Sequence, residues 1–304
     1  MPLLPMDDRD GFIWFDGRLV PWRDAKVHVL THGLHYASLV FEGERAYGGT
    51  IFMGKEHTER LFNSARMMDF TIPYSADEIN AAKAEVMKAN HLTDCYVRPV
   101  AWRGSEELGV NGRNCKIHTA IAMWSWPSYF TPEARMAGLK VVTGKWRRPD
   151  PNAIPCHAKC AGVYMICTLN KHEAVAKGYD ESLMLDSKGR VTETTGANLL
   201  FARGGNEVHV PLTDCFLNGI TRQTVLELAR RRGFKVFERA ILPEEFPQFD
   251  EAFVTGTAAE VTPVACIDDA KFPGRTVTKV LMDDYDALVH GKISVKVPIR
   301  LPGA

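Results

Sequence analysis

The sequence lacks an excess of either charge and lacks any long hydrophobic run. Lys and Arg together number 37, and so do Asp and Glu, so there is no net basic field to attract nucleic acid or an anionic membrane. No apolar stretch approaches the roughly 20 residues that a membrane-spanning helix needs. The N-terminal residues also lack the basic segment and apolar segment of a signal peptide. We therefore expect a cytoplasmic protein without a nucleic-acid or membrane partner.

The sequence also lacks the cysteine spacing of a disulfide framework or of a metal centre. The seven cysteines are scattered and odd in number, which indicates reduced thiols rather than disulfides. Cys156, His157 and Cys160 lie close together in the chain, but no second pair follows at zinc-like spacing. We expect no metal, and we interpret these cysteines as small buried side chains.

The remaining composition is that of a globular enzyme with one large or two medium domains. Hydrophobic residues make up 45% and charged residues 24% of the 304 residues, which is enough for a substantial core. The run 127–132 (PSYFTP) interrupts the strand and helix patterns around it and predicts a connection between domains. We place the first domain at residues 1–126, the interdomain loop at 127–138 and the second domain at 139–304.

The spacing of hydrophobic residues predicts several helices and strands in the part of the chain before this connection. Residues 12–22 are typical of two short strands around the turn dipeptide Asp16-Gly17. Residues 26–47 suggest a buried strand, a turn at Gly33 and a second strand. Two helices are expected at 55–68 and 75–90, the second with a capping box from Ser75 and Glu78. Strands follow at 95–104 and 117–126.

The stretch 153–201 carries the strongest chemical signal. Lys159 lies in a loop of small residues, and a helix is expected from 162 until Gly178. Two strands joined by a turn follow, with Glu193 in the second. Tyr164 lies in the first turn of the helix, so its side chain can reach the same pocket as Lys159. A buried lysine that faces a buried carboxylate suggests that Lys159 holds an aldehyde cofactor and Glu193 the ring nitrogen of that cofactor.

Two glycine–threonine turns downstream could bind an anion. The first, Gly219-Ile220-Thr221, opens a helix that runs to Arg231, and the second, Gly256-Thr257, follows an apolar strand. Backbone N–H groups at a helix start point outward and favour an anion. A plain helix cap is the simpler explanation for either turn alone. Together with an arginine, the two turns fit one phosphate dianion.

Pyridoxal 5′-phosphate requires each of these groups. A lysine forms the imine with its aldehyde, and a tyrosine hydroxyl bonds to its phenolic oxygen. A carboxylate keeps the pyridine nitrogen protonated, so that the ring can accept electrons from the substrate Cα. Helix-end amides and an arginine bind the phosphate. The residues therefore predict a pyridoxal 5′-phosphate enzyme with Lys159, Tyr164 and Glu193 around the ring.

With these motifs in view, the chain resembles the class IV aminotransferases, which are the fold-type IV pyridoxal phosphate enzymes. Within them it is most similar to the bacterial branched-chain amino acid aminotransferases, over about residues 10 to 290. The matching motifs, in chain order, are Phe41-Glu42-Gly43 with Arg45, Tyr96-Val97-Arg98-Pro99, Lys159, Glu193 with Asn198, Gly219-Ile220-Thr221 and Gly256-Thr257-Ala258.

The resemblance implies a role for each matched residue. Lys159 would form the imine and then move the proton between the substrate Cα and C4′ of the cofactor. Tyr164 would contact the phenolic oxygen, and Glu193 the pyridine nitrogen. The other cofactor-binding residues implied are Arg60, Leu217, Gly219, Ile220, Thr221, Gly256 and Thr257. Leu217 would pack on the ring, and the rest of this set would surround the phosphate.

The resemblance also implies a substrate pocket that accepts both leucine-like and glutamate-like side chains. Tyr96 and the backbone at Thr257 and Ala258 would bind the α-carboxylate. Arg98 would meet the side-chain carboxylate of glutamate. The substrate-binding set implied is Tyr36, Phe41, Tyr96, Arg98, Val110, Trp126, Tyr129 and Ala258. The reaction implied is transamination between L-leucine, L-isoleucine or L-valine and 2-oxoglutarate.

The fold implied is of the α/β (α+β) class. A small N-terminal α/β domain would precede a larger C-terminal domain with a barrel-like sheet, and the cofactor would lie between them. The family forms homodimers, so a homodimer or a higher homo-oligomer is expected, with Leu108-Gly109-Val110 reaching the neighbouring site. Cys160 after the lysine, Thr195-Gly196-Ala197 before Asn198 and the charged loop 103–107 depart from the family pattern. These departures leave the range of amino donors open.

Several other activities remain as alternatives. A D-amino acid aminotransferase, an (R)-amine transaminase and an aminodeoxychorismate lyase share the same fold. A cofactor-free aldolase would use the lysine but would leave the two anion-binding turns unexplained. A non-catalytic binding protein would bind its ligand without Lys159.

Overall fold

A computed structural model describes residues 5–126 and 136–301, and the contacts among them divide the chain into two units. The described part of unit 1 comprises residues 5–126 and 158–162, and that of unit 2 comprises residues 136–157 and 163–301. The segment that carries Lys159 thus belongs to unit 1, although it follows the first residues of unit 2 in the chain. The interdomain loop predicted at 127–138 falls mostly on residues 127–135, which lie outside the described residues.

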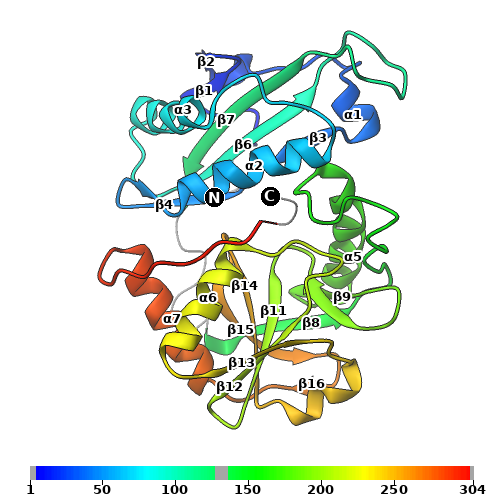
Figure 1. The fold of residues 1–304 in the computed structure, drawn as a ribbon, viewed down its shortest axis with the longest axis vertical. Coiled ribbons are helices and arrows are strands. Elements are labelled where there is room, and N and C mark those ends of the chain that lie inside the picture. Colours follow the sequence, from blue (N-terminus) through cyan, green and yellow to red (C-terminus); the bar gives the residue numbers. More distant parts are fainter. Residues whose placement is uncertain (1–4, 127–135, 302–304) are drawn as a thin grey trace. The chain divides into compact units, whose positions relative to one another are not determined.

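Unit 1 is built on a seven-stranded sheet with the order β2-β1-β7-β6-β4-β5, in which β3 also pairs with β6 (Figure 1). The strand pairs in it are antiparallel. Its strands are β1 (Phe12–Phe15), β2 (Arg18–Pro21), β3 (Leu39–Phe41), β4 (Glu44–Tyr47), β5 (Thr50–Ile51), β6 (Cys95–Arg103) and β7 (Ile117–Ser125). The predicted hairpin at 12–22 and the two long strands are confirmed.

Helices α2 (Gly54–Met67) and α3 (Ala76–Ala89) confirm the two helices predicted in unit 1. Helix α3 begins with the predicted capping box, in which Ser75 and Glu78 each bond to the backbone of the other. Its apolar face packs against β1 and β7 in a core that includes Ile79, Val86 and Ile121. The 3₁₀ helix η1 spans Trp22–Asp24.

The prediction of a strand and a turn at residues 26–38 is wrong. Helix α1 (His32–Tyr36) occupies this segment, and Val27 and Val29 are exposed. Gly33 lies inside the helix, where an added Cβ would be 3.3 Å from Cβ of Trp102. The glycine therefore permits close packing of the helix rather than a turn.

Unit 2 contains the barrel-like sheet that was expected. Six strands close into a ring because β10 pairs with both β9 and β11, in the order β10-β9-β8-β15-β14-β11. Strands β12 and β13 extend the sheet from β11, and β16 pairs with β15. The strands are β8 (Leu139–Thr143), β9 (Glu181–Leu185), β10 (Val191–Thr194), β11 (Asn198–Arg203), β12 (Glu207–Pro211), β13 (Lys235–Arg239), β14 (Glu251–Gly256), β15 (Glu260–Ile267) and β16 (Ala270–Lys271).

Aromatic and aliphatic side chains fill the core of unit 2. Phe201 stacks on Phe246 and Phe249, with ring centroids 5.5 and 4.7 Å apart, among strand residues such as Leu183 and Val254. The helices of the unit are η2 (Ala161–Tyr164, which starts in unit 1), α5 (Met165–Ala176), α6 (Ile220–Arg231), η3 (Pro243–Gln248) and α7 (Thr276–Val289). Residues 293–301 form neither helix nor strand.

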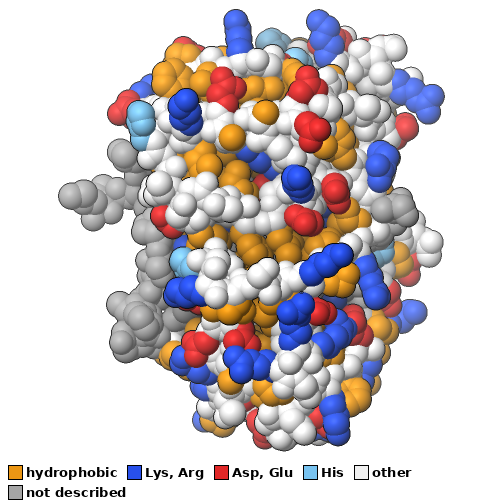
Figure 2. All heavy atoms as spheres, turned by 60° about the vertical axis from the view of Figure 1, so that its left-hand side comes forward, with side chains coloured by type: hydrophobic (Ala, Val, Ile, Leu, Met, Phe, Trp, Pro, Cys, Tyr) orange, Lys and Arg blue, Asp and Glu red, His pale blue; other side chains and the backbone are white. Residues whose placement is uncertain are grey.

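The charges on the surface and the state of the cysteines are those that the composition suggested. On the face drawn in Figure 2, basic and acidic side chains are interspersed. All seven cysteines are free thiols, as expected. Within residues 5–126 and 136–301, the helices are too short or too polar to span a lipid bilayer.

Candidate functional site

Unit 1 holds the backbone of Lys159 from both sides. The Lys159 N–H donates to Oγ of Ser64 on α2 at 3.0 Å, and the Lys159 carbonyl accepts from the Phe41 N–H at 3.0 Å. An isolated antiparallel bridge between Val40 and Cys160 continues this contact along β3. The Lys159 Nζ lies 5.1 Å from the centre of the Phe41 ring. The amine is therefore presented at a fixed place beside an aromatic face.

Aromatic side chains and one arginine gather on the same unit. The Arg98 guanidinium lies 4.7 Å from the Phe41 ring centre and donates to the Tyr96 hydroxyl at 3.1 Å. The ring of Trp126 lies 4.9 Å from that of Tyr96. The Nε of Arg98 is buried and has no hydrogen-bond partner among the described residues. A buried guanidinium N–H without an acceptor is suited to an incoming carboxylate.

Gly43 permits the close approach of a neighbouring strand. An added Cβ at Gly43 would lie 2.1 Å from the Tyr96 hydroxyl oxygen, a distance that no side chain could tolerate. The segment that approaches Gly43 is β6, which carries a predicted substrate-binding hydroxyl.

The other predicted substrate residues of the N-terminal part lie on α1, on the loop 108–110 or outside the described residues. The Tyr36 hydroxyl donates to the Leu108 carbonyl at 2.9 Å, which ties α1 to the loop 108–110. Val110 on that loop is 82% exposed. Tyr129 lies outside the described residues.

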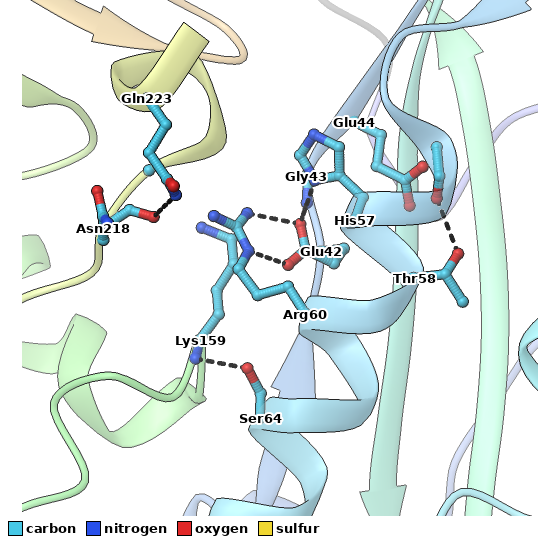
Figure 3. A network of polar contacts seen from close by, with 12 residues as sticks. Glu42, Gly43, Glu44, His57, Thr58, Arg60, Ser64, Lys159, Asn218 and Gln223 are labelled. Carbon is cyan, nitrogen blue, oxygen red and sulfur yellow. Dashed lines mark hydrogen bonds and ion pairs between the residues drawn. The ribbon is translucent and has the colours of Figure 1, made fainter. Parts of the chain in front are cut away.

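Arg60 on α2 is buried in a polar cluster (Figure 3). Its Nε and Nη2 donate to the two Glu42 carboxylate oxygens at 2.6 and 2.8 Å. Nδ1 of His57 lies 2.7 Å from the same carboxylate. Although burial opposes its ionisation, Arg60 and His57 hold the pKa of Glu42 well below its usual range.

A second buried ion pair lies beside this cluster. Nζ of Lys83 donates to Glu44 at 2.8 Å and to the Thr58 hydroxyl at 2.7 Å. Burial raises the pKa of Glu44 to about 7 despite the neighbouring lysine. Sequence reasoning named Glu42 only as part of a family motif and gave no role to either Glu42 or Glu44. The signal was present, since two carboxylates within an apolar strand region need buried cations.

In unit 2, strand register brings Glu193 beside Asn198. The two residues are direct partners between β10 and β11, and Asn198 is in turn the partner of Thr255 on β14. The Asn198 amide donates to the Glu193 carboxylate at 3.1 Å. Glu193 also forms an ion pair with Arg148 at 2.8 Å, with both side chains less than 10% exposed.

Arg148 is a site residue that sequence reasoning missed. Its guanidinium reaches the Val163 carbonyl at 3.4 Å and the Cys167 sulfur at 3.3 Å, besides Glu193. Burial disfavours its charge, yet Glu193, Cys167 and Tyr164 hold the Arg148 pKa above its ordinary value. Nothing in the loop around Arg148 distinguished it from its neighbour Arg147. Arg148 keeps a cation against the Glu193 carboxylate, which is suited to an ionised Glu193.

Asn198 also fixes the turn that precedes α6. It donates to the Leu217 carbonyl at 3.1 Å and accepts from the Gly219 N–H at 3.2 Å. An added Cβ at Gly219 would lie only 2.3 Å from the Asn198 side-chain oxygen. Gly219 is the N-cap of α6 and makes no side-chain cap bond, so the amides at Ile220 and Thr221 stand at a helix start suited to an anion. The turn and Glu193 together fit a phosphorylated pyridine.

The remaining predicted residues lie at the ends of unit 2 elements. Tyr164 ends η2 and precedes α5. Gly256 ends β14, where it pairs with Glu260 across a short hairpin that holds Thr257 and Ala258. An added Cβ at Gly256 would contact Cβ of Ala197 at 3.4 Å, so this hairpin packs close to the segment between β10 and β11.

Comparison with known proteins gives matches over nearly the whole chain. The model of the class IV amino-transferases matches residues 39–267, which include Lys159, Glu193 and both glycine–threonine turns. The branched-chain-amino-acid aminotransferase of Pseudomonas aeruginosa is 46% identical over 296 residues, covering 95% of this chain and 96% of that protein.

Solved structures give a similar result. The branched-chain amino acid aminotransferase of Escherichia coli has a TM-score of 0.89 and 36% identity, covering 95% of this chain and 97% of that one. A second branched-chain amino acid aminotransferase, from the organism abbreviated T.th., was solved with pyridoxamine 5′-phosphate. It has a TM-score of 0.90 and 39% identity, covering 94% of this chain and 96% of that one. The similarity thus holds for sequence and for fold along almost the full length.

Proposed function

Since the chain belongs to the class IV aminotransferases, we propose that it transfers amino groups between L-branched-chain amino acids and 2-oxoglutarate. The products would be branched 2-oxo acids and L-glutamate. Pyridoxal 5′-phosphate, when bound, supplies an aldehyde that captures the amino group and a ring that accepts electrons from the substrate Cα.

Lys159 is the proposed catalytic residue. Its amine would form the covalent bond to the cofactor and, once released by the substrate amine, would take the proton from Cα and return it at C4′. The two backbone bonds from Ser64 and Phe41 would keep the amine in place during both proton transfers. Because both transfers use one base, Nζ must be able to reach both atoms.

Glu193 and Tyr164 are proposed to tune the ring. The Glu193 carboxylate would hold a proton on the pyridine nitrogen, and Arg148 and Asn198 would keep that carboxylate ionised and oriented. The Tyr164 hydroxyl would bond to the phenolic oxygen, and Leu217 would pack against the ring face. Each group acts on a different atom of the cofactor.

The phosphate and the α-carboxylate are proposed to meet different donors. The phosphate would be bound by Arg60, by the helix-start amides at Gly219, Ile220 and Thr221, and by Gly256 and Thr257. The substrate α-carboxylate would be bound by the Tyr96 hydroxyl and by the backbone at Thr257 and Ala258.

The environment of Arg98 is the observation that supports the substrate pair. Its guanidinium lies against the Phe41 ring and carries a buried N–H without an acceptor among the described residues. The aromatic rings of Phe41 and Trp126 suit a leucine side chain, and the guanidinium suits the second carboxylate of glutamate. We include Tyr36, Val110 and Tyr129 in this pocket, with Val110 supplied by the second subunit of a homodimer or a higher homo-oligomer in the cytoplasm.

A substrate panel against 2-oxoglutarate tests this function. The expected result is fast turnover of L-leucine, L-isoleucine and L-valine, and a visible absorbance band of the bound cofactor. The variant R98M should raise KM for 2-oxoglutarate at least about ten-fold, as loss of one charge-assisted contact requires, and should change KM for L-leucine less. Preferred turnover of D-alanine or of an (R)-amine would instead assign one of the alternative activities of the same fold.

A further inference from the structure

We propose that Glu42 and His57 are positioning residues, which hold the Arg60 guanidinium in the orientation that binds the cofactor phosphate. This inference rests on the proposed function, because it takes Arg60 as a phosphate ligand. Neither Glu42 nor His57 would contact the cofactor, so both would act through Arg60. The network of these three residues is drawn in Figure 3.

The Glu42 carboxylate fixes the plane of the Arg60 guanidinium through two hydrogen bonds. Nε and Nη2 of Arg60 donate to Oε1 and Oε2 of Glu42, which is a two-point contact along one edge of the guanidinium. This contact uses two of the five N–H bonds of an arginine. The other edge of the guanidinium is formed by Nη1 and Nη2. Since the guanidinium is planar, fixing one edge also fixes the direction of the second.

His57 fixes the carboxylate in turn. Its Nδ1 lies 2.7 Å from Oε2 of Glu42, and the Gly43 N–H donates to the same oxygen at 3.2 Å. Burial lowers the His57 pKa, although the Glu42 carboxylate acts in the opposite direction. A neutral His57 must carry its proton on Nδ1 in order to donate to a carboxylate. His57 thus adds a directed bond to the cluster and no charge.

The cluster is too deeply buried to be a solvated helix face. Arg60 and His57 are 4% and 3% exposed, and Glu42 is 0% exposed. All three lie on α2 or directly after β3, the elements whose Ser64 and Phe41 also hold Lys159. A flexible arginine would lose rotamer freedom each time it bound a phosphate, and Glu42 removes that loss in advance.

The neighbouring carboxylate Glu44 provides a matched control. It is as buried as Glu42, at 0% exposure, but it pairs with Lys83 instead of Arg60. A change of Glu44 to glutamine should therefore weaken the unit without changing the recognition of phosphate. Any effect shared by E42Q and E44Q would reflect general stability, whereas an effect of E42Q alone would reflect Arg60.

The experiment compares pyridoxal 5′-phosphate with pyridoxal, which lacks the phosphate, by titrating the full-length apoenzyme and following absorbance. For R60M and E42Q we expect the Kd for pyridoxal 5′-phosphate to rise at least about ten-fold, and the Kd for pyridoxal to change less than about two-fold. H57L should also lose affinity for pyridoxal 5′-phosphate but not for pyridoxal, by a smaller factor. H57N should keep the wild-type preference for the phosphorylated ligand, because the asparagine amide N–H can replace the Nδ1–H bond to Glu42.

The outcomes separate this inference from the function on which it rests. If R60M keeps the wild-type preference for the phosphorylated ligand, the phosphate role of Arg60 fails and the inference fails with it. If R60M loses that preference but E42Q and H57L keep it, only the positioning role is overturned. An equal loss for both ligands, or the same loss in E44Q, also overturns it. Should E42Q not fold, the comparison of H57L with H57N decides the question.

Discussion

Replacing Arg148 with methionine should strongly destabilise unit 2. The Arg148 and Glu193 side chains are 7% and 9% exposed and lie 2.8 Å apart. Removing one partner of a buried ion pair costs about 3–5 kcal/mol, because the other charge remains buried without it. For a domain of this size, the lower figure corresponds to a fall in Tm of roughly 6–12 °C.

The double variant R148M/E193Q separates the lost charge pair from lost packing. It removes both charges, so no unpaired charge is left in the interior, and replacement of a whole buried pair is often close to neutral. We expect it to recover at least half of the fall in Tm seen for R148M. The ion pair predicts that the two substitutions are not additive: the double variant should lose less stability than the sum of the losses in R148M and E193Q.

The assay is thermal unfolding of the apoenzyme, followed by circular dichroism. The cofactor is removed first, because its binding would add to the apparent stability of each variant. The control is K177M, just past the end of α5, which breaks a solvent-exposed pair with Glu173 and should leave Tm within about 1 °C. A Tm for R148M within that same range, or a double variant no more stable than R148M, would refute the reasoning.

Three further predictions concern residues around the proposed cofactor. S64A leaves the Lys159 N–H without its acceptor at 3.0 Å, which should destabilise the enzyme by about 1–3 kcal/mol and broaden the visible cofactor band; unchanged Tm and spectrum would contradict this. G219A places a Cβ 2.3 Å from the Asn198 oxygen, so we expect a rise in the Kd for pyridoxal 5′-phosphate of at least about ten-fold by absorbance titration. Arg60 and His57 hold the Glu42 pKa well below its usual range, against the effect of burial. The ionised Glu42 carboxylate therefore stabilises the folded protein at any pH above its unfolded pKa of about 4.3. This stabilisation is lost as the pH falls below that value. The difference in Tm between wild type and E42Q should therefore shrink between pH 5 and pH 3, and a difference that grows would show the opposite linkage.

The elements that the sequence predicted correctly are those with a strong local pattern. The hairpin at Asp16-Gly17, the capping box at Ser75 and the helix end at Gly178 depend on neighbouring residues alone. Residues 26–38 were misread because apolar residues such as Val27 and Val29 suggested a buried strand, although both are exposed.

Within the site, local motifs identified Lys159 and Glu193 but not the residues that hold them. Ser64 lies 95 positions from Lys159, and Arg148 lies 45 positions from Glu193. These distances in the chain are closed only by the fold, so no spacing rule could indicate the pairs. A buried charge in an apolar segment, such as Glu42, indicates that a partner exists without indicating which one it is.

The most direct test of the account is the identity of the amine that binds the cofactor. Borohydride reduces a carbon–nitrogen double bond and so fixes pyridoxal 5′-phosphate to the lysine that carries it. After proteolysis and mass spectrometry, we expect the reduced adduct on the peptide that contains Lys159, and no adduct in the variant K159A. An adduct on another lysine, or none in the wild type with cofactor present, would contradict the account.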